Sequence, residues 1–200
     1  MVDWMAKTHQ RLLQVLPIND STSTHTWTDS YPYSCISIFA LHPQYADLRQ
    51  LPALKDKLEA DRFEVLREEL NALPQIDYER VNNAKLKYLR LLFEQEGKKV
   101  LASKEFKTFF ADCERWLAPY AHYCYLRDFY GTCVFSEWPD HKQWNEADRK
   151  ALSNPKSELY NKVAYYYYVQ FVLDQQMHSA HEYARARGVI LKGDIPIGVN

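Results

Sequence analysis

The stretch VILKGDIPI, residues 189–197, follows a long helical pattern and opens with three apolar residues. It predicts a β-strand with a polar side chain, Asp194, toward its carboxyl end. A second apolar run, LLQVL at residues 12–16, follows a short helical pattern and is stopped by Pro17. Strands that each follow a helix are typical of parallel α/β architecture, and a run without polar alternation predicts burial on both faces. We therefore expect an α/β fold in which these two strands lie parallel.

Almost everything from about residue 50 to residue 187 predicts helix, whereas residues 19–34 predict a loop. Apolar residues recur at helical spacing over residues 51–73, 81–91, 106–120 and 159–180. Gly188 follows a basic helix end, and we expect it to be the C′ glycine of the last helix. Because two strands cannot form a sheet that buries both faces, the pattern indicates a part of a larger α/β domain.

Composition excludes several classes of function. The 200 residues carry a net charge of −1, with 26% charged and 46% hydrophobic residues, which is typical of a soluble globular chain and not of a nucleic-acid-binding protein. Only five glycines occur where average usage would give roughly fourteen. A glycine-rich loop for a dinucleotide or phosphate is therefore excluded.

Cysteine spacing and hydropathy bear on metal binding and on the location of the protein. The four cysteines lack the spacing of a zinc site, so no metal is expected. The chain shows no signal peptide and no apolar stretch long enough to span a bilayer. We expect a cytoplasmic protein with reduced thiols, no cofactor, and neither nucleic acid nor membrane as a partner.

Several motifs follow one another in a fixed order along the chain. They are LQVLPIN at residues 13–19, DSYPYS at 29–34, FALHP at 39–43, Trp-Pro at 138–139 and GDIPI at 193–197. This ordered set resembles the 4-α-glucanotransferases of glycoside hydrolase family 77 and covers essentially the whole chain. The sequence of the loop is closer to the long bacterial and plant cytosolic form of that family.

The resemblance implies a (β/α)₈ barrel of which this chain is an internal fragment. In that frame residues 1–20 are the first barrel helix and the second strand, and residues 21–49 form a substrate-site loop. Residues 50–187 are a large, mostly helical insertion, and residues 188–200 carry the third strand.

The resemblance also implies an activity. An enzyme of this family transfers α-1,4-linked glucosyl units from maltose or maltodextrin to a sugar acceptor by a retaining mechanism. The implied partners are an α-glucan, maltose or a maltooligosaccharide, and the remainder of the barrel. The family's three catalytic carboxylates lie on later strands, so no catalytic residue is expected in this chain and the chain alone is expected to be inactive. The alternative is a non-catalytic helical module that binds carbohydrate or a partner.

Three aromatic residues of the loop are candidate substrate-binding residues. The resemblance implies that Tyr33 contacts sugar, and a phenol offers both a stacking face and a hydroxyl. A buried loop anchor is the alternative for Tyr33. Tyr31 takes the position of a family serine, and Trp27 is either a sugar platform or a lid over the core.

Three short polar residues complete the candidate site: Asn19, Asp29 and Asp194. Polar groups at strand and loop ends build the sites of barrel enzymes, although turn capping is the alternative for Asn19 and Asp29. We expect Asp194 to orient site groups or the loop.

Two further clusters call for a structural interpretation. His178 and His181 lie one turn apart and are expected on a solvated helix face, not at a metal. The tyrosine run at residues 165–168 covers every face of a helix. It predicts packing, with a path for glucan as the alternative for one of its members.

Overall fold

The two predicted strands pair in parallel in the computed structural model, which describes residues 1–141 and 143–199. β1 (Leu12–Gln14) lies beside β3 (Ile190–Lys192), residue against residue. The parallel arrangement expected from the sequence is therefore confirmed.

Both strands are shorter and more exposed than the sequence predicts. Leu12 and Leu16 are largely exposed, so the expectation of a strand buried on both faces is wrong for this chain. The reason is that, among the described residues, β1 pairs with β3 alone. β3 ends at Lys192 and not at 197, since Gly193 pairs poorly in a ladder and Pro196 has no N–H to donate.

The segment from residue 50 to residue 187 is mostly helical, as predicted. In chain order it holds α2 (Lys57–Asn71), α3 (Tyr78–Ala102), α4 (Lys104–Tyr130), α5 (Glu146–Leu152) and α6 (Glu158–Arg185). The long helices begin at Asp or Ser side chains that accept backbone N–H groups of the first turn. The short α5 lies outside the four ranges in which the sequence shows helical spacing.

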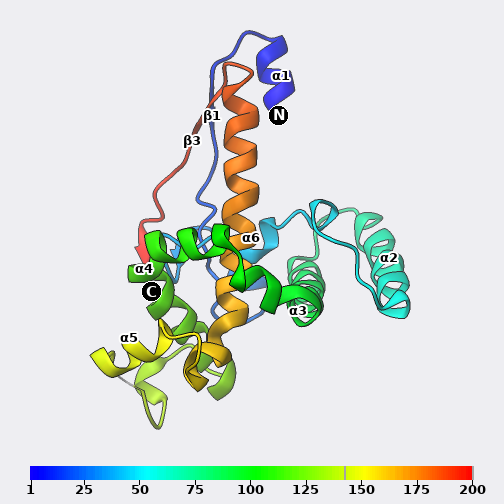
Figure 1. The fold of residues 1–200 in the computed structure, drawn as a ribbon. Coiled ribbons are helices and arrows are strands. Elements are labelled where there is room, and N and C mark those ends of the chain that lie inside the picture. The colour runs from blue at the N-terminus through cyan, green and yellow to red at the C-terminus, as the bar shows by residue number, and fades with distance from the viewer. Residues whose placement is uncertain (142, 200) are drawn as a thin grey trace.

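Helix α6 is the axis of the structure. α3, α4 and α5 pack around its amino-terminal half, while the strand pair and α1 (Val2–Lys7) lie beside its carboxyl-terminal half (Figure 1). The tyrosine run at residues 165–168 is buried on all sides of α6, so the packing prediction is confirmed. Tyr167, for example, meets the ring of Phe110 edge to face, with centroids 5.1 Å apart.

Gly188 turns the chain from α6 into β3. Its φ is +69°, its N–H donates to the Arg185 carbonyl at 3.0 Å, and the Val189 N–H donates to the Ala184 carbonyl at 3.0 Å. This pair of bonds is a Schellman motif with Gly188 at C′, as predicted, and it aims β3 back along the helix.

Membrane-spanning helices and metal-binding clusters are both absent from the described residues. None of their helices has the length and apolar character needed to cross a bilayer. No group of three or more His, Cys, Asp or Glu side chains among them could hold a metal ion, and His178 and His181 are exposed as expected.

Candidate functional site

The loop that carries Tyr33 is fastened to the segment that follows β3. The Tyr33 hydroxyl donates a hydrogen bond to Asp194 Oδ2 at 2.8 Å, and this bond raises the pKa of Tyr33. Directly after Tyr33, β2 (Ser34–Cys35) pairs in parallel with β4 (Gly198–Val199). Two predicted site residues 161 positions apart thus form a hydrogen bond. Asn200, the last residue of the predicted segment 188–200, lies outside the described residues.

Gly198 allows a close approach at this junction. A Cβ added to Gly198 would lie 2.5 Å from the carbonyl oxygen of Tyr33. Any side chain would therefore push the backbone of Tyr33 away, because real Cβ atoms do not come so near an oxygen. Glycine at position 198 therefore allows the segment after β3 to lie close to the Tyr33 backbone.

The other two aromatic candidates of the loop face solvent. Tyr31 is 59% exposed, and its ring centroid lies 5.8 Å from that of Tyr33 at an angle of 56°. Trp27 begins the short helix η1 (Trp27–Ser30) and is 68% exposed, so it does not cover the core. Tyr33 itself is half-buried. The loop therefore offers aromatic faces and a hydroxyl, which is the chemistry that binds sugar rings.

Asp29 organises the loop from the inside. It is buried and accepts hydrogen bonds from the His25 N–H at 2.7 Å, the Thr24 N–H at 3.1 Å and the Thr24 hydroxyl at 3.0 Å. These contacts are those of turn capping. Asn19 is half-buried at the base of the loop, where it forms an antiparallel bridge with Leu41.

A buried hydrogen-bond network ties the base of the loop to the helices. Asp20, 1% exposed, accepts the Tyr120 hydroxyl at 2.5 Å and the Thr22 N–H at 2.9 Å. Gln170 Nε2 donates to the Tyr120 hydroxyl at 3.2 Å, and the Gln170 amide also pairs with the N–H and the carbonyl of Leu41, both at 2.9 Å. Burial raises the pKa of Tyr120 far above its usual value, so its hydroxyl stays a donor.

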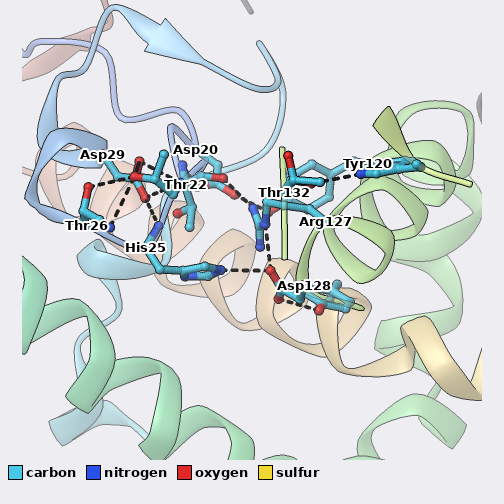
Figure 2. Close-up of polar contacts among 12 residues, drawn as sticks. Asp20, Thr22, His25, Thr26, Asp29, Tyr120, Arg127, Asp128 and Thr132 are labelled. Carbon is cyan, nitrogen blue, oxygen red and sulfur yellow. Dashed lines mark hydrogen bonds and ion pairs between the residues drawn. The ribbon is translucent and has the colours of Figure 1, made fainter. Parts of the chain in front are cut away.

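A second network lies at the carboxyl end of α4 (Figure 2). Asp128 Oδ1 lies 2.8 Å from His25 Nε2 and 2.7 Å from Arg127 Nε, and Oδ2 accepts the Tyr166 hydroxyl at 2.7 Å. The Arg127 side chain, which is buried, also donates to the Thr22 carbonyl. Burial acts to raise the pKa of Asp128, but the bonds from His25 and Arg127 outweigh it and hold the pKa below its usual value.

The two networks contain the residues that sequence reasoning misses. In each network a loop residue pairs with a residue of α4 about 100 positions away, Asp20 with Tyr120 and His25 with Asp128. Single charges on a helix predict a solvated face. One signal was available, because Tyr120 and Arg127 are seven positions apart and so share one side of α4, where most side chains are apolar.

Comparison with known proteins identifies the family. The sequence model of glycoside hydrolase family 77, described as 4-alpha-glucanotransferase, matches residues 1–200. A parallel strand pair joined through a long helical excursion is a segment of α/β architecture, and this chain belongs to glycoside hydrolase family 77.

Relatives cover the whole chain, but the chain covers only part of each relative. The 4-alpha-glucanotransferase DPE2 of Oryza sativa subsp. japonica is 39% identical over 202 residues, which is 100% of this chain and 21% of the rice protein. The 4-alpha-glucanotransferase of Chlamydia muridarum is 28% identical over 201 residues, 98% of this chain and 36% of that protein.

Two solved structures share the fold. The amylomaltase from Streptococcus agalactiae in complex with acarbose matches with a TM-score of 0.72 at 21% identity, over 100% of this chain and 38% of that one. The amylomaltase from Corynebacterium glutamicum matches with a TM-score of 0.69 at 19% identity, over 100% and 27% respectively.

Proposed function

We propose that this chain is part of the catalytic domain of a 4-α-glucanotransferase that moves α-1,4-linked glucosyl units between maltooligosaccharides. Membership of the family carries the proposal, since the matching family and the relatives bear this activity in their names. The chain contributes one wall of the sugar site. Its partners are an α-glucan or maltooligosaccharide and the remainder of the barrel.

Within that domain, residues 1–20 and 188–200 are barrel elements, and the pair β1–β3 corresponds to neighbouring strands two and three. Residues 21–49 are the substrate-site loop, and residues 50–187 are the insertion between the strands. The exposed apolar side chains of the pair support this assignment, because Leu12, Leu16 and Ile190 are positioned to be covered by further strands and helices.

The sugar site of this wall is centred on Tyr33 and Asp194. Their hydrogen bond supports the proposal, because it holds a phenol at the end of a parallel strand, where barrel enzymes build their sites. Tyr31 and Trp27 offer the exposed stacking faces beside it. Asn19 and Asp29 set the shape of the loop that carries these rings. None of these residues is a nucleophile or a general acid, so the chain binds the sugar and does not break the bond.

Kinetics of the protein that carries this chain test the proposal. Tyr33→Phe keeps the ring and removes the hydroxyl, so kcat/KM on maltodextrin should fall by up to about tenfold. Tyr33→Ala also removes the stacking face and should cost more. Tyr125→Phe is the matched control, because its hydroxyl has no hydrogen-bond partner among the described residues. Normal kcat/KM in both Tyr33 variants would refute the site, and absence of glucosyl transfer by the wild-type protein would refute the function.

A further inference from the structure

Two side chains of α4 hold the substrate-site loop by hydrogen bonds: Arg127 at the Thr22 carbonyl, and Asp128 at His25. In the sequence, His25 lies between Asp20, which is buried at the base of the loop, and Trp27, which is exposed. Its φ of +59° is a left-handed conformation that a residue with a Cβ adopts only when other contacts impose it. The ring is exposed, and its hydrogen bond is the 2.8 Å contact with Asp128.

Open space adjoins this contact. A cavity of about 300 Å³ and a second of about 360 Å³ both have His25, Arg127 and Asp128 in their walls. Close packing therefore does not hold the His25 ring in place, and the bond to Asp128 is what fixes its position.

The other end of the contact is rigid. Asp128 is held by Arg127 and by the Tyr166 hydroxyl from α6, while Arg127 is itself buried and bound to the Thr22 carbonyl. Two long helices thus fix the carboxylate, and the carboxylate fixes the loop at His25.

We propose that Asp128 is a positioning residue for the sugar site, acting through His25 to hold residues 22–31 in the conformation that presents Trp27 and Tyr31. Asp128 touches no sugar in this account. The helical insertion therefore has a task in substrate binding, which is to set the shape of the loop. This inference rests on the proposed function.

The first measurement needs no substrate. Hydrogen exchange in the protein that carries this chain reports the order of residues 22–31, in particular of the Thr24 and His25 amides that donate to Asp29. Loss of this exposed hydrogen bond in His25→Ala should speed their exchange roughly three- to tenfold. His25→Gln restores an amide nitrogen near the place of Nε2 and should return exchange toward the wild-type rate.

The second measurement links loop order to sugar. In His25→Ala the KM for maltodextrin should rise by a similar factor with a smaller change in kcat, because the reacting groups are untouched. Asp128→Asn should act in the same direction, and the double variant should be no worse than the more severe single variant, since both act through one contact. Asp112→Asn is the matched control, with the same change of charge at an exposed position of the same helix.

The outcomes separate the two proposals. Wild-type exchange rates in His25→Ala overturn the positioning role, and so does faster exchange with unchanged KM and kcat. Failure of His25→Gln to restore exchange while it folds normally also overturns that role, because the hydrogen bond would not be the cause. If the wild-type protein transfers no glucosyl units, the proposed function fails, while the exchange rates still decide whether Asp128 holds the loop.

Discussion

Replacing Tyr120 by phenylalanine removes one hydroxyl from the buried network under the loop. That hydroxyl donates to Asp20 Oδ2 at 2.5 Å, and Asp20 is 1% exposed, so the substitution takes one donor from a buried carboxylate. Gln170 loses only its weaker 3.2 Å contact, because its amide keeps both bonds to Leu41. A hydrogen bond to a buried charged group contributes about 1.5–3 kcal/mol, and we expect the free energy of unfolding to fall by that amount.

Urea unfolding followed by far-ultraviolet circular dichroism measures this change, since helix dominates the structure. The urea concentration at the midpoint should fall, while the dependence of the unfolding free energy on urea concentration (the m-value) should stay unchanged. This combination indicates a loss of stability without a change in compactness. Tyr125→Phe deletes the same atom from the same helix without breaking a hydrogen bond among the described residues, and it should change stability by less than about 0.5 kcal/mol. If Tyr120→Phe costs no more than Tyr125→Phe, the network does not hold the base of the loop.

Three further predictions concern the junction, the pH dependence and the isolated chain. Gly198→Ala should displace the Tyr33 backbone and lower kcat/KM on maltodextrin about tenfold, whereas Gly193→Ala, whose Cβ meets nothing within 4 Å, should not; equal effects would remove the steric argument. Burial lowers the pKa of His42, so its neutral form contributes stability above about pH 6.5 that is lost as the pH falls below that value. His42→Asn keeps a side chain that can cap the turn, and it should reduce the change of the urea midpoint between about pH 7 and pH 5. If the midpoint of the variant changes with pH as much as that of the wild type, other groups cause the pH dependence. The chain of 200 residues alone should produce no glucose or longer oligosaccharides from maltotriose, because the resemblance implies that the family's catalytic carboxylates lie on later strands of the barrel; turnover at an enzyme-like rate would contradict this.

Local patterns predicted the elements whose causes are local. The Schellman motif at Gly188 follows from a basic helix end and a glycine, and the helical region follows from apolar residues at a spacing of three and four. The parallel pairing of β1 and β3 was also predictable, since each strand follows a helix. Two-residue strands such as β2 and β4 are too short to leave a pattern.

Burial and long-range pairing could not be obtained in the same way. The run at residues 12–16 is apolar apart from Gln14, but the sequence does not say what covers Leu12 and Leu16, which are exposed in this chain. The contact between His25 and Asp128 joins residues 103 positions apart, and it depends on how the loop lies against α4. For Tyr33 and Asp194 the resemblance supplied both residues, and the structure supplied their hydrogen bond.

A crystal structure of the protein that carries this chain, soaked with acarbose, tests the central claim most directly. The account predicts that a sugar ring lies in van der Waals contact with the Tyr33 ring, with heavy atoms within about 4 Å of each other. It also predicts a sugar hydroxyl within about 3 Å of the Tyr33 hydroxyl or the Asp194 carboxylate. Acarbose bound in the active site with Tyr33 and Asp194 both out of contact would contradict it.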